Sequence, residues 1–402
     1  MSASRSTSPL AIFFLVLPYG ISAGFAAVTL PFVLTKVGFP VAVSASIVAV
    51  GISSNVWLFL WGPVADLTLT PRRWYLIGDV AGATGLLLLA FMPLRTNAVA
   101  ALTVVVFLSQ VATSLVALPL GRIMAYTVAD PEKGRAAGWY QAGNLGGTGV
   151  GGGAGVWLTS HYSIAMAGAV LAATMLMCAL GLFFVPDVRV AREGTVGQKL
   201  RQIGAELRDL LRSPIALLAI VLVCSPVGAG AASNLWSAVA PQWHASPDRV
   251  ALVTGALSGV ASVIGCVLGG WVADRVGRWW SYFGAGVLMA VVATWMALAP
   301  HTMAIYSAGV LFYAAVTGTA YAAYSAVLLY VIGRGAASTK YATLSSLGNL
   351  PVAYMTAFDG RAHDRLGAAG MLYAESVVGA GFTVLFLVAL GRIKARARTP
   401  QA

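Results

Sequence analysis

The residues of this chain that could do chemistry stand in two matching motifs about half a chain apart. Asp66 closes the first motif, Trp61–Asp66, and Asp274 lies in the second, Gly269–Arg278. The two aspartates are 208 residues apart, and each lies where an apolar run meets charge. A carboxylate at the start of another helix stabilises that helix by roughly 0.3–2 kcal/mol. Because such a contact can break and reform, a pair of them could switch a protein between two conformations.

Arginines accompany both aspartates, and together they form a predicted set of gating contacts. The set comprises Asp66, Arg72, Arg73, Asp274, Arg275 and Arg278. The sequence repeat predicts that Asp66 lies near the start of the eleventh apolar span and Asp274 near the start of the fifth. We expect Asp274 to matter more, because its motif is intact while an insertion stretches the first copy. Plain helix capping is the alternative interpretation.

No catalytic signature accompanies these motifs. The chain has no nucleophile elbow, HExxH motif, Walker loop or dinucleotide fingerprint. Its three cysteines lie inside apolar runs, and its four histidines lack the spacing of metal ligands. The glycine-rich stretch Gly146–Gly153 lies within an apolar span, so we expect close helix packing or a flexible point there. The sequence thus predicts no enzyme, no cofactor and no metal, with an integral membrane enzyme as the disfavoured alternative.

The elements that must position these residues are membrane-spanning helices. Hydrophobic residues make up 59% of the chain and charged residues 9%, whereas soluble domains carry roughly a quarter charged residues. Apolar runs of about 20 residues, enough to cross a bilayer as a helix, recur throughout. They predict an all-α polytopic membrane protein with twelve transmembrane helices in two pseudo-symmetric six-helix halves. The expected spans are 10–35, 42–66, 73–92, 98–124, 137–160, 163–186, 214–240, 247–273, 279–300, 302–330, 337–358 and 369–391.

The polar segment 187–213 divides the chain into an N-terminal half, 1–186, and a C-terminal half with a short basic tail, 214–402. Apolar residues recur every three to four positions between Val196 and Leu211. This spacing suits an amphipathic helix that lies on an anionic membrane surface. A plain tether between the halves is the alternative.

Positive charge is distributed unevenly between the two sides of the membrane. The formal net charge is +12. If the N-terminus is cytoplasmic, twenty of the 25 lysines and arginines lie on the cytoplasmic side. This bias follows the positive-inside rule, and it accounts for the net charge without nucleic acid as a partner. We therefore expect both termini and the segment 187–213 to be cytoplasmic, in a cell inner membrane.

Three short motifs carry a resemblance to a known family. The pattern Gly-x3-Asp-Arg-x-Gly-Arg that ends at Arg278 resembles the loop signature of the major facilitator superfamily. Span count, halving and repeat spacing extend this resemblance over essentially the whole chain. The segment Lys340–Leu350 is similar to a motif of the branch that holds muropeptide permeases and acetyl-coenzyme A transporters. Leu17–Gly20 fits the Gly-Leu-Pro opening of that branch, which related siderophore permeases share.

Ionisable and polar residues inside the spans are the candidates for solute binding and coupling. Arg122 is the strongest, because the resemblance places its span beside the cavity, where it would meet a carboxylate or phosphate; snorkelling to the interface is the alternative. Asp79 and Glu375 are candidates for proton coupling, with partnership to a neighbouring helix as the alternative. The other predicted solute-binding residues are Tyr19, Asn55, Gln110, Asn234, Trp236, Tyr324 and Asn349.

The resemblance implies a permease that works by alternating access. Since no ATP site is present, we expect a proton gradient to drive it as a symporter. Its branch implies import of a polar organic solute, neutral or anionic, of the muropeptide, siderophore or acyl-coenzyme A type. The expected partners are that solute, protons and the lipid bilayer, and the chain is expected to act as a monomer. Proton-driven efflux of a drug or metabolite is the main alternative, because the loop motif does not set direction.

Overall fold

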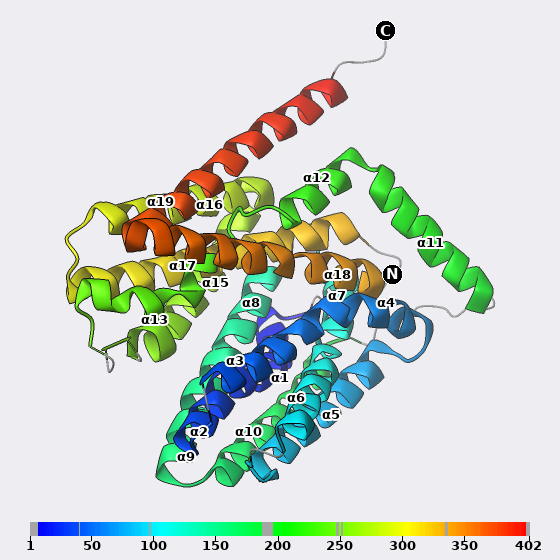
Figure 1. Cartoon of the computed structure of the whole chain (residues 1–402). Helices are drawn as coiled ribbons and strands as arrows, with labels where there is room; N and C mark the ends of the chain where they lie inside the picture. The colour runs from blue at the N-terminus through cyan, green and yellow to red at the C-terminus, as the bar shows by residue number, and fades with distance from the viewer. Residues whose placement is uncertain are drawn as a thin grey trace. The chain divides into compact units, whose positions relative to one another are not determined.

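The computed structural model of the protein describes residues 7–39, 41–95, 98–186, 196–246, 249–250, 252–333 and 337–398. Within these ranges every regular element is helical (Figure 1). The prediction of an all-α protein is therefore confirmed. The first part of the predicted linker, 187–195, and residues 399–402 of the basic tail lie outside the described residues.

Nine of the described helical stretches are long and apolar enough to cross a membrane. They account for ten of the twelve predicted spans, because the stretch Ala337–Ala389 breaks at Gly367, whose φ is 71°. The fifth predicted span lies in the glycine-rich helix that begins at Lys133, and the seventh is divided. The chain is thus a multi-pass membrane protein.

The chain falls into two compact units that each combine separate parts of the sequence. The first unit comprises Met1–Asp130, Trp139–Ile203 and Gly333–Ser346, and the second comprises Pro131–Gly138, Gly204–Ile332 and Leu347–Ala402. Each unit therefore takes the start of one helix from the other end of the sequence.

The first unit is built mainly from α1 to α10. Its elements are α1 (Pro9–Gly24), η1 (Phe25–Thr29), α2 (Leu30–Lys36), α3 (Val41–Ser53), η2 (Ser54–Trp57), α4 (Leu58–Leu67), α5 (Pro71–Phe91), α6 (Val99–Ser114), α7 (Ala117–Thr127), η5 (Val150–Ala154), α9 (Gly155–His161), α10 (Ile164–Cys178), η6 (Ala179–Phe184) and α18 (Ala337–Leu347). Two helices, α8 (Lys133–Gly149) and α11 (Val196–Arg212), run from one unit into the other. Its core packs α1 and η1 against α5, α6 and α10.

The second unit is built from the C-terminal part of the sequence. Its elements are η4 (Asp130–Glu132) at the unit boundary, α12 (Pro214–Val223), η7 (Ala231–Asn234), α13 (Trp236–Val239), η8 (Ala240–Trp243), η9 (Leu252–Leu257), α15 (Ser258–Val276), α16 (Arg278–Leu298), α17 (Met303–Ile332) and α19 (Asn349–Arg398). In its core, α17 packs against α15 and α16, and α19 packs against α16. The largest fully buried side chains of this core are aromatic, among them Trp243, Tyr306 and Tyr313.

Glycines at four-residue spacing let α1 lie backbone to backbone against the helix formed by α8, η5 and α9. The stripe comprises Gly143, Gly147, Gly151 and Gly155. A Cβ on Gly147 would lie 2.7 Å from the carbonyl oxygen of Leu17, and a Cβ on Gly151 would overlap with the carbonyl group of Ile21. At Gly153, in contrast, a Cβ meets nothing within 4 Å. Close helix packing, one of the two predicted roles of this stretch, is therefore confirmed.

The seventh predicted span, 214–240, is not a continuous helix. α12 ends at Val223, before Pro226, and the chain then turns through Gly228 and Gly230. Their φ angles are 68° and 67°, in the left-handed region that glycine reaches without steric cost. Helical structure resumes only at Ala231, in the short segment η7. Hydropathy alone predicted a continuous span here, because it carries no information on backbone conformation.

Tyrosine hydroxyls bind the backbone carbonyl groups around this break. The donor and acceptor pairs are Tyr354 with Cys224 at 2.9 Å, Tyr321 with Ala229 at 3.2 Å, Tyr306 with Trp236 at 2.9 Å, and Tyr282 with Val227. Inside a membrane each unpaired backbone polar group costs several kcal/mol, on the order of a lost hydrogen bond or more. The tyrosines therefore allow the span to be discontinuous within the bilayer.

Candidate functional site

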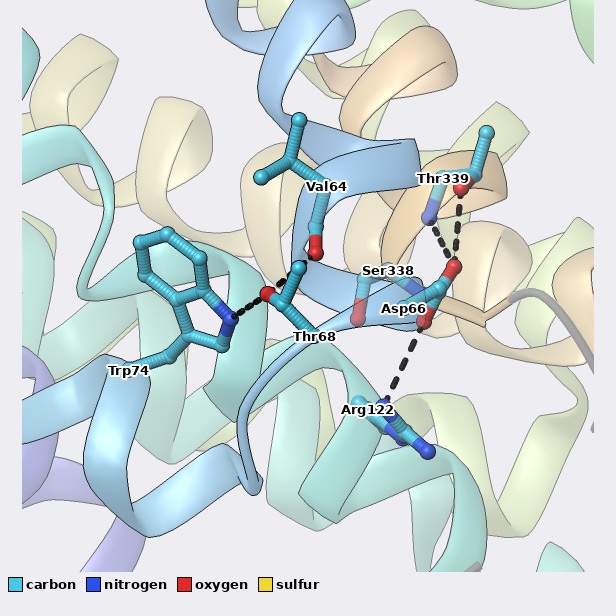
Figure 2. A network of polar contacts seen from close by, with 7 residues as sticks. All are labelled: Val64, Asp66, Thr68, Trp74, Arg122, Ser338 and Thr339. Atoms are coloured by element: carbon cyan, nitrogen blue, oxygen red, sulfur yellow. Dashed lines mark hydrogen bonds and ion pairs between the residues drawn. The ribbon is translucent and has the colours of Figure 1, made fainter. Parts of the chain in front are cut away.

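Asp66 binds the start of α18 in the first unit. Its carboxylate accepts from the backbone N–H of Ser338 at 3.3 Å and from that of Thr339 at 2.9 Å (Figure 2). The Thr339 hydroxyl donates to the same carboxylate at 2.8 Å. Arg122, from α7, lies 3.6 Å from the other oxygen, and both charged side chains are nearly buried. We call these four residues the first latch.

Local contacts fix the end of α4 that carries Asp66. The Thr68 hydroxyl donates to the carbonyl of Val64 at 2.6 Å, and the indole N–H of Trp74 donates to Thr68 at 3.0 Å (Figure 2). Gly62, one turn before Asp66, lets α18 approach closely, since a Cβ there would lie 2.6 Å from the Cα of Thr339. The Gly-x3-Asp spacing of the motif thus has a steric cause.

Asp274 binds the start of α8 in the second unit in the same way. Its carboxylate accepts from the backbone N–H of Gly134 at 2.7 Å and from that of Arg135 at 2.9 Å. The Arg135 guanidinium adds a contact at 3.3 Å and also reaches Glu132 at 3.0 Å. We call Asp274, Gly134 and Arg135 the second latch. A Cβ on Gly270 would lie 2.6 Å from the carbonyl oxygen of Gly134.

The two latches share a backbone pattern and differ in their cations. In each, two consecutive N–H groups of a first helical turn, which have no partner within their own helix, donate to one aspartate. The second donor residue also contributes its side chain, Thr339 in one case and Arg135 in the other. The cation of the first latch, Arg122, comes from a third helix and is nearly buried, whereas Arg135 is about half exposed. This is the placement that the sequence repeat predicts, and the gating role stays a prediction.

The other four arginines of the predicted gating set lie near the latches in sequence but bind elsewhere. Arg72 donates to the carbonyl of Val185 at 2.5 Å. Arg73 is exposed in the first turn of α5. The remaining two stack on aromatic rings: Arg275 on Trp271 at 4.0 Å and Arg278 on Tyr330 at 4.7 Å. The ion pairs that the structure describes for Asp66 and Asp274 are formed by Arg122 and Arg135, and not by these four arginines.

Within the first unit, the predicted solute-binding residues fall into two groups. Tyr19 donates to the side chain of Asn55 at 3.0 Å, and both are partly exposed. Gln110 is buried and donates to the Ser22 hydroxyl at 2.9 Å, inside a cluster completed by Thr113. This cluster joins two packed helices, which is the common role of a buried amide in membranes. The pair Tyr19 and Asn55 is thus the better-placed solute contact of the two.

An aromatic pair beside Tyr19 was not singled out by the sequence. Tyr140 and Tyr341 meet edge to face at 6.2 Å, and both are buried. Tyr341 lies in the segment Lys340–Leu350, and its ring packs on Gly121, where a Cβ would lie 2.7 Å away. Because Gly121 has no side chain, the Tyr341 ring can pack directly against the backbone of α7.

In the second unit, three of the four predicted solute-binding residues lie at or near the break in the seventh span. The Asn234 amide is exposed and donates to the Thr356 hydroxyl at 2.9 Å. Trp236 is buried and packs edge to face on Tyr313, with ring centroids 5.2 Å apart. Tyr324 lies 6.4 Å from the ring of Tyr282. Asn349, the first residue of α19, is partly exposed.

Three carboxyl groups are buried within the spans. Asp79 is fully buried, and neither of its oxygens has a hydrogen-bond partner among the residues that the structure describes. Glu375 accepts from the Tyr313 hydroxyl. Asp359, which the sequence analysis missed, is also fully buried and has no hydrogen-bond partner in the described part of the chain. It is close enough to Glu375 for their charges to interact. It was missed because the eleventh span was drawn to end at residue 358, one position too early.

Comparisons with known proteins agree with this architecture. The chain matches the family model of the Major Facilitator Superfamily over residues 12–353. No curated protein matches it significantly. Similar solved structures include the human organic anion transporter MFSD10 (TETRAN), at 16% identity and a TM-score of 0.72, covering 95% of this chain and 98% of that one. A variant of the E. coli fucose:proton symporter FucP aligns at 13% identity and a TM-score of 0.72, covering 94% and 97%.

At such identities the solved structures show a shared fold, whereas the family model spans most of the sequence. The predicted family is therefore confirmed by the family model. With its repeated loop motif, its helical spans and this match, the chain belongs to the Major Facilitator Superfamily.

Proposed function

We propose that this protein is a secondary transporter that works by alternating access and imports a polar organic solute together with protons. The observation that carries the proposal is the repeated latch in a chain of this superfamily. Each latch joins an even-numbered span to the start of an odd-numbered span from the other end of the sequence. Two such contacts can hold one side of a transporter closed and release it, because each is a local, reversible charge interaction.

The same proposal divides the chain into halves 1–186 and 214–402, joined by the linker 187–213. The part of the linker that forms α11 supports a surface position, since Ile203 is buried and its polar neighbours are exposed. A helix of this kind, rich in basic residues, suits the anionic cytoplasmic leaflet.

Arg122 can contact a solute only if the solute competes with Asp66 for its guanidinium group. In the described conformation its guanidinium is engaged by Asp66. A solute carboxylate or phosphate would therefore compete with Asp66 for the same cation. Binding of an anionic solute would then weaken the first latch, which gives the solute a direct means of opening the gate.

Two solved relatives of the same fold support the choice of solute and driving ion. One is an organic anion transporter and the other a fucose:proton symporter. An anionic solute would use Arg122, and a neutral one would use the pair Tyr19 and Asn55. Muropeptides, siderophores and acyl-coenzyme A esters are polar organic molecules, and many of them carry negative charge, so they are the first solutes to test.

Topology provides the first test of the proposal. We place both termini and the linker in the cytoplasm, at the inner membrane. In a variant without Cys178, Cys224 and Cys266, a membrane-impermeant thiol reagent added to whole cells should label Ser246→Cys and should not label Leu200→Cys. Opening the cells should make Leu200→Cys reactive, which controls for burial. Labelling of Leu200→Cys in intact cells would reverse the assigned orientation.

Transport itself is tested with purified protein in proteoliposomes. A radiolabelled muropeptide, a ferric siderophore and an acyl-coenzyme A should be offered under an imposed gradient, acidic outside. We expect one of the three to accumulate, and a protonophore should reduce its accumulation to the level of empty vesicles. Extrusion of the solute against its gradient, driven by inward proton flow, would establish efflux instead. Solute movement that ignores the proton gradient would contradict coupling altogether.

A further inference from the structure

Two carboxyl groups meet in the interior of the second unit. Asp359 and Glu375 belong to the parts of α19 before and after the break at Gly367, and they are 0% and 7% exposed. The break returns the chain so that the two side chains come within range of each other's charge. The Tyr313 hydroxyl, from α17, donates to one oxygen of Glu375.

Few groups are available to neutralise this pair. The second oxygen of Glu375 and both oxygens of Asp359 have no hydrogen-bond partner in the described structure. The helices packed on this part of α19 offer little charge: α12, η7 and α17 contain no charged residue, and α16 carries only Arg278, which is stacked on Tyr330. Besides the two carboxyls, the titratable group that interacts with Tyr313 is Tyr321 of α17. The other tyrosines on these helices include Tyr306 and Tyr282, whose hydroxyls donate to the carbonyls of Trp236 and Val227.

Of the charged residues of α19 between Asp359 and the break, Arg365 is exposed to solvent, and the others have described partners outside the pair. Arg361 donates to the carbonyl of Ala357, and His363 contacts Gln242 at 3.0 Å and Asp364 at 3.8 Å. Two carboxylates that share a buried site without a cation cannot both remain ionised, because their repulsion is not screened by solvent. One proton on the pair removes a charge and supplies a hydrogen-bond donor. Proton loading is a plain transfer from hydronium, which leaves water and a carboxylic acid.

Glu375 lies beside the broken part of the seventh span. The backbone N–H groups of Ala231 and Ala232, the first residues of η7, lie beside the Glu375 carboxyl. Trp236 packs on Tyr313, and the Asn234 amide binds Thr356, one turn before Asp359 in α19. A short segment held by hydrogen bonds at both ends moves more readily than a continuous helix, since it has no i→i+4 ladder through the break.

We propose that Asp359 and Glu375, with Tyr313, form a proton-binding site that controls the position of the segment carrying Asn234 and Trp236. With one proton on the pair, held by Asp359, the ionised Glu375 attracts the amides of Ala231 and Ala232 and holds η7 in place. A second proton, taken up by Glu375, weakens that attraction and releases η7 together with the two solute candidates. The site thereby makes solute binding depend on the proton. This inference rests on the proposed function and names the residues of its coupling step.

The site is tested first without any solute. Infrared difference spectra of the full-length protein in lipid, recorded between acidic and alkaline pH in H₂O and D₂O, report buried carboxylic acids by their C=O band. The wild type should show such a band, and Asp359→Asn and Glu375→Gln should each remove the contribution of the pair. Asp364→Asn, a change at an exposed carboxylate on the same helix, should leave the spectrum unchanged. A band identical in all four proteins would overturn the site.

The second readout separates coupling from transport. For whichever solute is transported in proteoliposomes, accumulation driven by the pH gradient should be lost in Asp359→Asn and Glu375→Gln. Solute counterflow, which needs no net proton movement, should continue at the wild-type rate. Gradient-driven accumulation retained in both variants would overturn the site while the proposed function stands. No accumulation in the wild type, with the infrared band present, would refute the proposed function and leave the proton site intact.

Folding does not obscure these outcomes. Asp359→Asn keeps the shape of the side chain and removes no described hydrogen bond, so it should elute as a single species in detergent. Tyr313→Phe provides the matched positioning test, because it removes only the hydroxyl that binds Glu375. It should shift the pH at which the carboxylic acid band appears while keeping the band itself. An unchanged pH profile would exclude Tyr313 from the site.

Discussion

Replacing Gly151 by valine will prevent most of the protein from reaching its folded state, whereas the same change at Gly153 will leave the folded yield unaltered. The two positions are two residues apart and lie on opposite faces of the helix that packs against α1. At Gly151 the nearest obstacle to a side chain is the backbone of Ile21. Extra atoms in a packed interior cost about 1–3 kcal/mol, and more where the obstacle cannot change rotamer.

The measurement is the monodisperse fraction of detergent-solubilised protein after brief heating. Gly151→Val should lower the melting temperature or abolish the folded peak, and Gly151→Ala should fall between it and the wild type. Gly153→Val is the matched control, since its helix propensity and hydrophobicity change equally while a Cβ there meets nothing within 4 Å. Equal loss in both valine variants would assign the effect to helix flexibility rather than to contact with α1.

The latches give the second large effect. Replacing Asp66 or Asp274 by asparagine keeps the shape of the side chain but removes the charge that binds a helix start. A charge of this kind is worth up to about 2 kcal/mol in a partly buried position, and about 1–2 kcal/mol changes a ratio of two states by a factor of roughly 5–30. Folding should survive, because both asparagines can still accept one backbone hydrogen bond, while the closed conformation should lose population.

The contacts in the structure and the sequence motif lead to different expectations of which aspartate contributes more to the closed conformation. The intact motif favours Asp274, yet Asp66 also accepts from the Thr339 hydroxyl and pairs with the nearly buried Arg122. Asp66→Asn leaves that cation without its partner, and an unpaired buried charge is costly. We therefore expect Asp66→Asn to shift the balance further than Asp274→Asn, which disturbs only the half-exposed Arg135.

Pulsed distance measurements between spin labels decide the matter. Labels at Leu69 and Thr343 flank the first latch, and labels at Pro131 and Val276 flank the second. Each asparagine variant should broaden or lengthen the distances, and Asp209→Asn, at an exposed site on α11, should leave them as in the wild type. Distances that stay constant in both latch variants would reduce these aspartates to helix caps.

The same distance measurements, recorded without solute, test whether Arg122 is part of the first latch. A latch residue predicts that Arg122→Ala lengthens the distances across the first latch as Asp66→Asn does. A pure solute contact predicts unchanged distances and weaker solute binding. Arg122→Lys should recover only part of the closed population, because an ammonium lacks the planar geometry that binds a carboxylate by two hydrogen bonds.

Much of this protein could be read from its sequence because membranes simplify the problem. Every backbone polar group in a bilayer must be paired within the chain, so a long apolar run has almost no choice but helix. The all-helical fold, ten of the twelve spans and the placement of Asp66 and Asp274 follow from hydropathy and from a repeat of constant spacing. Close helix packing at Gly146–Gly153 was one of two roles predicted from glycines within an apolar span, whereas the structure showed that glycines at four-residue spacing face α1.

Features that depend on contacts between distant segments required the tertiary structure. Tyrosines of α16, α17 and α19 bind the carbonyl groups around the break at Gly228 and Gly230. The local sequence does not predict these donors, because they come from distant helices. No pattern in the sequence indicated a partner for Arg122, and the structure shows that α4 brings Asp66 within 3.6 Å of it. Asp359 read as the charged end of a span, sixteen residues before Glu375, and it became half of a buried pair only through the turn at Gly367. Sequence determines which groups are present and how each helix forms; the free energy of a buried charge depends on its neighbours in space, and those are decided by packing alone.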